Sequence, residues 1–333
     1  MTIPASPDAA IVARGLRRSF KGGIEAVRDI DLTIAAGQVF GFLGPNGAGK
    51  TTIVRMLCTL LPPTAGTAHV VGLDVVADAA AVRRRIGVAL QEIGLDPMQS
   101  GRELLELQCG LYGIAGRAGR DRTTELLELV GLTEAADRRC KTYSGGMKRR
   151  LDLASALVHA PDVLFLDEPT TGLDPASRLT IWEEVRRINA GGATVFLTTQ
   201  YLEEADQLCD RLAIIDGGLL VAQGTPSELK AQLGHDAVSL SVDDAQVTAT
   251  ESALRDLPGL ERTQAEPGGL TLYVSDGAGS VAEIVRRLDR AQIEMQSVSV
   301  ARPSLDDVFL QATGRRLEGA DQTDGDGEGT VQR

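Results

Sequence analysis

The stretch GPNGAGKTT, residues 44–52, fits the pattern G-x-x-x-x-G-K-[ST] of a phosphate-binding loop. Residues 11–43 before it alternate in the manner of strands, and apolar side chains from Ile53 to Leu60 recur after it at helical spacing. The motif therefore has the strand, loop and helix that phosphate binding requires. Glycines let backbone N–H groups converge on phosphate oxygens, and the dipole of the following helix adds positive potential. Alone, this stretch predicts only that the chain binds a nucleoside triphosphate.

Three side chains of the loop have distinct predicted roles. Lys50 is expected to reach the β- and γ-phosphates, Thr51 to ligate Mg²⁺ through its hydroxyl group, and Thr52 to lie near the α-phosphate. The residues of the loop that we expect to bind the nucleotide are Gly44, Pro45, Asn46, Gly47, Ala48, Gly49, Lys50, Thr51 and Thr52.

A second stretch, VLFLDE at residues 163–168, is an apolar strand that ends in two acids. Both carboxylates then lie at the carboxyl edge of a sheet, where α/β folds bind their ligands. Asp167 is the expected Mg²⁺ partner, and Glu168 is the expected general base that orients the attacking water. A strand followed by solvated acids is common by itself, but together with the loop it indicates a triphosphatase.

The order of the elements predicts an α/β core. A helical pattern at Ala176–Asn189 is followed by apolar strands at Ala193–Leu197 and Arg211–Ile215. Strands that alternate with helices imply a largely parallel, helix-covered sheet. Between Ser100 and Val130 the pattern is largely helical, and Ser100 with Glu103 forms a plausible capping box.

After about Lys230 the order becomes strand, helix, strand, strand, helix, strand, which predicts a small α+β domain of the ferredoxin-like type. A last helix is expected to start at Ser304, with Asp307 completing a capping-box-like pair. Its apolar face is more typical of packed core than of a partner site. The members of that face are Leu305, Val308, Phe309 and Ala312.

The composition of the 333-residue chain limits the possible functions. A formal net charge of -12 argues against broad nucleic-acid binding, which needs concentrated Lys and Arg. The four cysteines include no CxxC pair and there are three histidines, so we expect reduced thiols and no zinc site. The first residues do not fit a secretion signal, and no apolar run approaches the roughly 18 residues of a spanning helix. Any membrane role is therefore expected to act through a partner.

The stretch YSGGM at residues 143–147 resembles the signature of ABC ATPases, and the similarity covers roughly residues 11–228 with the motifs in family order. The resemblance implies that Phe20 stacks on adenine, that Gln91 contacts the metal site and couples it to a partner, and that Asp174 lies at a dimer interface. With the pattern after Lys230 and the Gly- and Asp-rich end of the chain, it predicts this division: a flexible N-terminus at 1–10, an ABC ATPase domain at 11–230 with a helical subdomain at about 92–150, an accessory domain at 231–315, and a disordered acidic tail at 316–333.

The signature itself has a physical interpretation. Ser144 is expected to be the N-cap of a helix, with Gly145 and Gly146 keeping the backbone open to an anion. The basic run 148–150 then places positive charge at the positive end of the helix dipole, which is unfavourable unless an anion docks there. In the resembled family this loop meets the γ-phosphate bound by the opposite subunit, which implies a head-to-tail dimer, and one chain holding every motif favours a homodimer.

One position departs from the resembled family. Where that family usually has a switch histidine, this chain has Gln200, which can donate a hydrogen bond but cannot become charged. With YLEEADQL at 201–208 and PSLDDVF at 303–309, Gln200 makes the chain similar to the daunorubicin-type drug-resistance subgroup of exporter ATPases. Members of that subgroup pair with a separate membrane permease.

The resemblance implies an ATP- and Mg²⁺-dependent ATPase subunit on the cytoplasmic face of the membrane that powers export through a permease. The cargo, whether drug, antibiotic, lipid or glycan precursor, stays open. The alternative is a soluble ABC ATPase that acts on nucleic acid or ribosomes, which a single phosphate loop, the lack of heptads and the acidity disfavour. A third hypothesis makes the C-terminal domain a regulatory or ligand-binding module.

Overall fold

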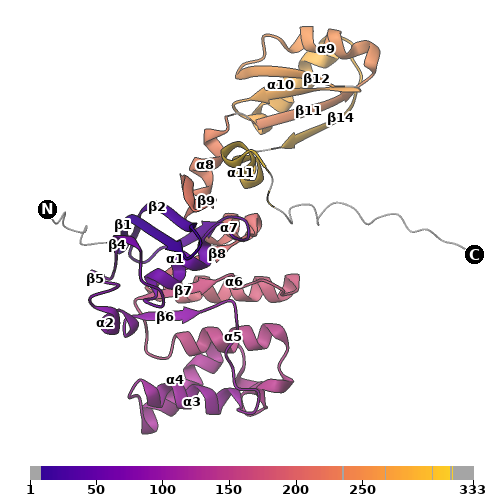
Figure 1. Ribbon diagram of the computed structural model, residues 1–333. Helices are drawn as coiled ribbons and strands as arrows, with labels where there is room; N and C mark the ends of the chain where they lie inside the picture. Colours follow the sequence, from indigo (N-terminus) through magenta and orange to yellow (C-terminus); the bar gives the residue numbers. More distant parts are fainter. Residues whose placement is uncertain (1–8, 235, 267, 302, 316, 318–333) are drawn as a thin grey trace, which may run out of the picture. The chain divides into compact units, whose positions relative to one another are not determined.

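The computed structural model describes residues 9–234, 236–266, 268–301, 303–315 and 317. The chain forms two compact units that divide between Pro226 and Ser227 (Figure 1). The flexible terminus expected at 1–10 lies mostly outside the described residues, but Ala9 and Ala10 belong to the first strand because Ala9 pairs with Ala35. The tail expected at 316–333 lies outside the described residues except for Leu317.

A six-stranded sheet forms the centre of the first unit. Its strand order is β10-β9-β3-β8-β7-β6, and every pair is parallel except β10 with β9. The strands β3, β7 and β8 are buried along their whole length because helices and a second sheet cover both faces. The bounds are β3 Val39–Leu43, β6 Ile86–Ala89, β7 Val163–Asp167, β8 Thr194–Thr199, β9 Arg211–Asp216 and β10 Leu219–Gly224.

A second sheet of this unit is antiparallel, with strand order β2-β1-β4-β5. Helix α1 (Lys50–Leu57) contacts β2 and β4 of this sheet and β7 of the first one, and a single buried core joins the two sheets around it. This packing holds the start of α1, and so Lys50, at the end of β3. The bounds are β1 Ala9–Phe20, β2 Ile24–Ala35, β4 Ala65–Val70 and β5 Leu73–Asp74.

A helical layer follows β6 along the chain and returns to the sheet at β7 (Figure 1). Helix α3 packs on α4 and α5, and the predicted capping box at Ser100 and Glu103 begins α3. The last helix of this layer, α5, starts directly after Ser144. The helices of the unit are α2 Ala79–Arg83, α3 Gly101–Leu111, α4 Gly116–Leu129, α5 Gly145–Ala156, α6 Pro175–Ala190 and α7 Leu202–Leu208, with 3-10 turns at Thr133–Ala135 and Cys140–Thr142.

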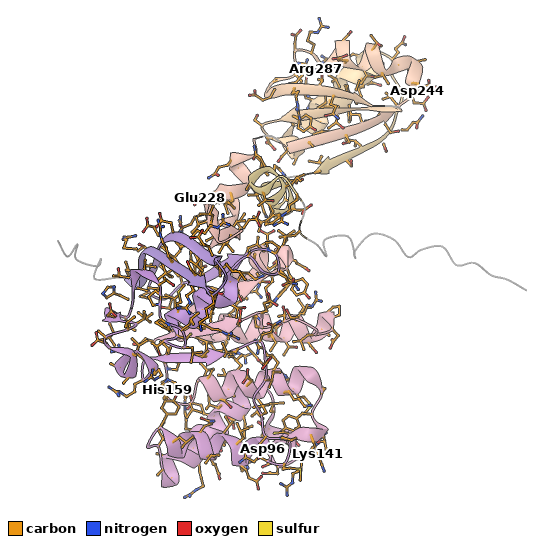
Figure 2. All side chains as sticks on the ribbon, viewed as in Figure 1. Asp96, Lys141, His159, Glu228, Asp244 and Arg287 are labelled. Carbon is orange, nitrogen blue, oxygen red and sulfur yellow. The ribbon has the colours of Figure 1, made fainter. Side chains whose placement is uncertain are left out.

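A groove of about 360 Å³ lies between the helical layer and the end of α1 with β6. The rings of Tyr112 and His159 stack in it with centroids 4.0 Å apart (His159 is labelled in Figure 2). Burial lowers the pKa of His159, and its Nε2 lies 2.9 Å from the backbone oxygen of Ile86. Leu60, which also lines the groove, is 55% exposed, so the groove has an apolar rim.

The second unit has the predicted ferredoxin-like architecture. Its antiparallel sheet has the order β12-β13-β11-β14, and α9 and α10 pack on the face that carries the buried residues of β11 and β13. Helix α11 begins at the predicted capping box of Ser304 and Asp307, but Ala312 is exposed, so the prediction that it belongs to the packed face is wrong. The bounds are α8 Pro226–Gln232, β11 Asp236–Val242, α9 Val247–Leu254, β12 Leu260–Glu266, β13 Gly269–Val274, α10 Gly277–Arg290, β14 Met295–Ala301 and α11 Leu305–Thr313.

Among the described residues, no helix is long and apolar enough to cross a membrane.

Candidate nucleotide-binding site

The phosphate-binding loop runs from the end of β3 into α1 and forms one wall of a cavity of about 180 Å³. Gly49 has a φ of 107°, and a Cβ there would lie 2.4 Å from the backbone oxygen of Ala26, so only glycine fits. Gly44 is constrained in another way, because its Cβ would lie 2.3 Å from the oxygen of Ile215. The residues that line the cavity are Pro45, Asn46, Gly47, Gly49, Lys50, Thr51, Thr52, Gln91 and Glu168.

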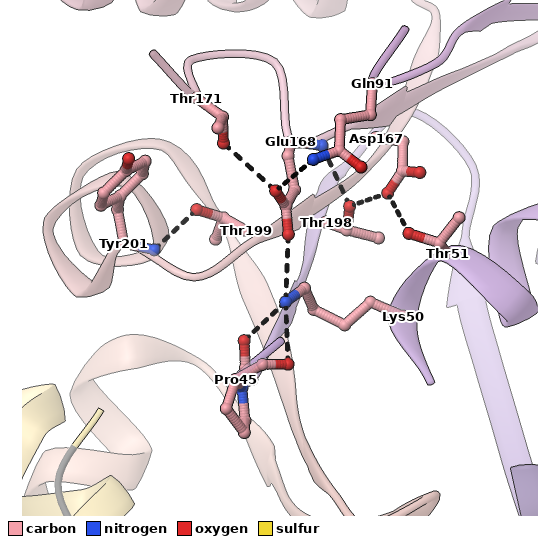
Figure 3. Close-up of polar contacts among 11 residues, drawn as sticks. Pro45, Lys50, Thr51, Gln91, Asp167, Glu168, Thr171, Thr198, Thr199 and Tyr201 are labelled. Atoms are coloured by element: carbon pink, nitrogen blue, oxygen red, sulfur yellow. Dashed lines mark hydrogen bonds and ion pairs between the residues drawn. The ribbon is translucent and has the colours of Figure 1, made fainter. Parts of the chain in front are cut away.

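Lys50 is the central cation of this cavity and is only 4% exposed. Its Nζ donates to the backbone oxygens of Gly44 (2.7 Å) and Pro45 (3.1 Å) and pairs with Oε1 of Glu168 at 3.2 Å (Figure 3). Burial lowers the pKa of the Lys50 ammonium group, and the Glu168 carboxylate opposes that change. The ion pair thus keeps two buried charges neutralised at the point where phosphate charge would arrive.

Glu168 is held from both sides at the end of β7. Its Oε2 accepts from Thr171 Oγ1 at 3.2 Å and from Gln91 Nε2 at 3.5 Å (Figure 3). Its backbone is in the left-handed region, with φ 49°, and its N–H donates to the oxygen and the hydroxyl of Thr198, both at 3.1 Å. These bonds maintain a strained conformation that directs the carboxylate toward Lys50.

Asp167 faces the start of α1. Its Oδ1 accepts from Thr198 Oγ1 at 2.5 Å and from Thr51 Oγ1 at 3.2 Å, while its Oδ2 is buried and has no hydrogen-bond partner in the described structure. A buried carboxylate oxygen without a partner is costly unless a cation or water binds it. No group of three or more His, Cys, Asp or Glu side chains in the described part of the chain could hold a metal ion by itself.

The signature loop at the start of α5 packs against the start of α6 and does not line the cavity. Ser144 Oγ accepts from the N–H of Met147 at 3.2 Å, as predicted for an N-cap. A Cβ on Gly146 would lie 2.8 Å from Ser177 Oγ, so the two helix starts are closely packed. Asp174 is the N-cap of α6 and accepts from the N–H (3.0 Å) and hydroxyl (2.6 Å) of Ser177.

Arg149 corrects one interpretation from the sequence. The basic run 148–150 was expected to await an anion, but Arg149 is 4% exposed and donates to the backbone oxygens of Leu90, Asp167 (3.1 Å) and Pro169 (3.0 Å). An arginine has five N–H donors in a rigid fork, which suits several carbonyl groups at once. This side chain therefore fastens α5 to the end of β7 and is not available to an anion.

Several predicted site residues do not line the cavity. Phe20, at the end of β1, is 39% exposed and lies under the guanidinium group of Arg18, 4.8 Å from the ring centroid. Gln200 is half-buried in the turn between β8 and α7. Ser144, Gly145, Gly146 and Asp174 also lie outside the cavity lining.

Thr171 and Thr198, which hold Glu168 and Asp167, were not among the predicted site residues. The only signal in the sequence was a pair of threonines at 170–171, shortly after Glu168, and a second pair at 198–199, directly before Gln200.

Comparisons with known proteins extend over both units. A profile described as ABC transporter matches residues 27–171, and one described as the C-terminal domain of DrrA1-3-like ATP-binding proteins matches residues 224–313. The daunorubicin resistance ATP-binding protein DrrA3 of Streptomyces coeruleorubidus is 46% identical over 315 residues, covering 94% of this chain and 99% of that protein. The chain belongs to the ABC transporter ATP-binding proteins. The predicted similarity to the daunorubicin-type subgroup is confirmed.

A further relative in this family has a different stated role. The Nod factor export ATP-binding protein I of Paraburkholderia xenovorans strain LB400 is 41% identical over 314 residues, covering 94% of this chain and 99% of that protein.

Solved structures share the fold of this ABC ATPase. An ATP-binding subunit of an ABC transporter has a TM-score of 0.61 at 25% identity, covering 68% of this chain and 93% of that one. A dimeric ATP-binding cassette in a post-hydrolysis state with ADP and Pi has a TM-score of 0.60 at 24% identity, covering 65% of this chain and 98% of that one. The predicted fold is confirmed, and ATP hydrolysis is the activity of the chain.

Proposed function

We propose that this ABC ATPase powers export through a separate membrane permease, as a homodimer on the cytoplasmic face of the membrane. The observation that carries the ATPase part is the meeting of Lys50, Gln91 and Glu168 in one cavity, with Asp167 bonded to Thr51 beside it. The export part is supported by relatives whose names state daunorubicin resistance and Nod factor export. The cargo proposed is therefore a drug-like, antibiotic or lipid-like molecule.

Hydrolysis begins, in this proposal, with an exchange of partners by Lys50. Incoming β- and γ-phosphates attract the Lys50 ammonium group away from Glu168, which is 3.2 Å away. The released carboxylate then accepts a proton from the attacking water, while Gln91 and Thr171 keep its other oxygen oriented. Pairing with Lys50 thus keeps the base occupied until a triphosphate binds.

The residues around Asp167 fit a magnesium ion. The unpartnered Oδ2 and the nearby Thr51 hydroxyl would supply two oxygen ligands, and a site with so few protein ligands suits a cation that keeps phosphate and water oxygens. When bound, Mg²⁺ would neutralise charge on the β- and γ-phosphates. Thr198 holds the Asp167 carboxylate in place for this role.

The position of the signature supports a dimer. Ser144, Gly146 and Asp174 lie outside the cavity, although the resemblance of these residues to the family motifs implies that they belong to a shared nucleotide site. A second copy arranged head to tail would add these residues to the cavity of the first, giving two shared sites. Phe20 would contact adenine and Gln200 the γ-phosphate in the same complex.

The groove between α1 and the helical layer is the surface that we assign to the permease. The groove lies next to Gln91, since Leu90 lines it. Its rim has exposed apolar surface, which would be buried from water when a partner docks. The exposed large apolar side chains that line it are Leu60 and Tyr112.

Co-purification tests this assignment. The chain is expected to co-purify from membranes with a polytopic membrane protein, and Leu60→Glu should abolish that association without changing basal ATPase activity. Val285→Glu on α10 places the same charge on a similarly exposed residue, 41% against 55%, and should have no effect. Binding to ribosomes or nucleic acid, without association with any membrane protein, would instead favour the alternative function.

Gln200 leads to a prediction about pH dependence. Glutamine does not titrate, so Gln200→Ala should lower the ATPase rate by the same factor, about tenfold, at pH 6 and pH 8. Gln200→His is the matched variant and should introduce a dependence on pH near about 6.5. Rates measured across this range decide the matter: an activity limb near that pH in the unmodified protein that disappears in Gln200→Ala would contradict the assigned contact.

A further inference from the structure

A buried glutamate on α7 lies behind the nucleotide site. Glu204 is 1% exposed, and its Oε1 accepts two hydrogen bonds, from Thr170 Oγ1 at 2.9 Å and from Trp182 Nε1 at 3.0 Å. Burial raises the pKa of this carboxyl group, while the hydrogen bonds from Trp182 and Thr170 oppose the rise. No ion pair involves Glu204 in the described part of the chain, so the group is a hydrogen-bonding centre rather than half of a salt bridge.

The donors to Glu204 come from the segments that carry the proposed site residues. Thr170 lies in the loop directly after Glu168, and its neighbour Thr171 bonds the Glu168 carboxylate at 3.2 Å. Trp182 lies on α6, the helix that Asp174 caps. Glu204 itself lies on α7, which begins two residues after Gln200. The loop after Glu168 and helix α6 therefore both bond one carboxyl oxygen on α7.

We propose that Glu204 is a positioning residue that couples Glu168, Asp174 and Gln200, so that the base, the dimer-interface acid and the γ-phosphate contact move together. The inference rests on the proposed function of those three residues. Both Thr170 and Trp182 are almost fully buried, at 0% and 5% exposure, and the close packing of protein interiors resists an independent shift of either side chain. A displacement of α7 would therefore move the loop that holds Glu168.

The geometry of the hydrogen bonds to Glu204 predicts which substitutions of this residue keep its role. Both donors use the same oxygen, Oε1, and glutamine has an oxygen at that place. Glu204→Gln should therefore keep the coupling, whereas Glu204→Ala should leave two buried donors without an acceptor. Normal activity in Glu204→Gln would show that Glu204 acts by accepting hydrogen bonds and that its negative charge is not required.

The test compares these two variants by steady-state kinetics and nucleotide binding on the full chain. Glu204→Ala should lower kcat by about 10- to 100-fold, because small misplacements of catalytic groups have effects of this size, while the Kd for ATP stays within about threefold. Glu204→Gln should stay within about threefold of the unmodified protein in both. Trp182, the single tryptophan of the chain, gives a second readout. Its fluorescence should change on addition of Mg-ATP in the unmodified and Gln proteins and not in the Ala protein.

Glu184 supplies a matched control on α6. It is also a buried glutamate, 3% exposed, but its charged neighbours are Arg150 and Arg187 rather than the site loops. Glu184→Ala should change thermal stability and leave kcat and the fluorescence response unaltered. Glu204→Ala with a normal kcat, or Glu204→Gln as impaired as Glu204→Ala, would overturn the proposal.

If Glu204→Ala does not fold, Thr170→Val removes one donor at nearly constant volume and should lower kcat by about threefold or more with little change in the Kd for ATP. An unchanged kcat in Thr170→Val would also overturn the proposal. The proposed function has a separate test in Glu168→Gln. A Glu168→Gln protein that hydrolyses ATP normally would remove the basis of both, whereas an inactive one beside a fully active Glu204→Ala would contradict the positioning role alone.

Discussion

Replacing Glu168 by Gln is expected to lower the ATP hydrolysis rate by at least about 100-fold while ATP still binds, because general base catalysis contributes about 10²- to 10⁴-fold. The amide has nearly the same shape and can still accept from Thr171, which lies 3.2 Å from Oε2. It cannot take a proton from water. The substitution also removes the partner of Lys50, 3.2 Å away, so the lysine is free to bind phosphate. Single-turnover assays and equilibrium binding of ATP measure the two effects separately.

The same variant should accumulate as an ATP-bound dimer. Light scattering in the presence of Mg-ATP is expected to show about twice the monomer mass, and ADP should not produce this state. Glu183→Gln changes an exposed glutamate on α6 in the same way and should behave as the unmodified protein. A Glu168→Gln protein with a normal hydrolysis rate would show that another group is the base.

Replacing Lys50 by Met is expected to weaken the binding of Mg-ATP by about 100-fold, since a lost charge-assisted hydrogen bond of about 3 kcal/mol corresponds to that factor. Methionine fills the volume of the lysine stem in a cavity wall that is only 4% exposed. Calorimetric titration with Mg-ATP measures the affinity. Unchanged affinity in Lys50→Met would contradict the assignment of this cation to the phosphates.

Thermal stability measures how the ion pair between Lys50 and Glu168 affects the folded, nucleotide-free protein. Lys50→Met leaves the buried Glu168 carboxylate without its counter-charge, which is destabilising. The double variant Lys50→Met with Glu168→Gln removes both charges and should melt at a higher temperature than Lys50→Met alone. If the double variant is no more stable, the ion pair has no role in the stability of the nucleotide-free protein.

The elements with local constraints could be predicted well. Gly49 must be glycine because of its own φ angle, and the N-caps at Ser100, Ser144 and Ser304 depend on residues three positions away. Strand alternation likewise indicated the ferredoxin-like order of the second unit. In all of these, the residues that decide the conformation lie within a few positions of one another.

Features that depend on distant contacts could not be predicted. The first strand begins at Ala9 because Ala35 pairs with it, and Ala312 is exposed because of where α11 packs. The local charge pattern around Arg149 indicated an anion site, but α5 packs on β6 and buries this side chain among backbone oxygens. Sequence spacing contains no information on which face of a helix will be covered by a segment from another part of the chain.

The sequence by itself determined the family, the phosphate loop, the two acids at the end of β7 and the absence of a histidine at position 200, since each is a matter of residue type at a fixed spacing. Only the tertiary structure decided that Lys50 pairs with Glu168 and that Glu204 joins three segments of the site. Both arrangements join groups that are 22 or more positions apart along the chain. Their distances depend on how sheets and helices pack, and packing depends on the whole buried core rather than on any one motif.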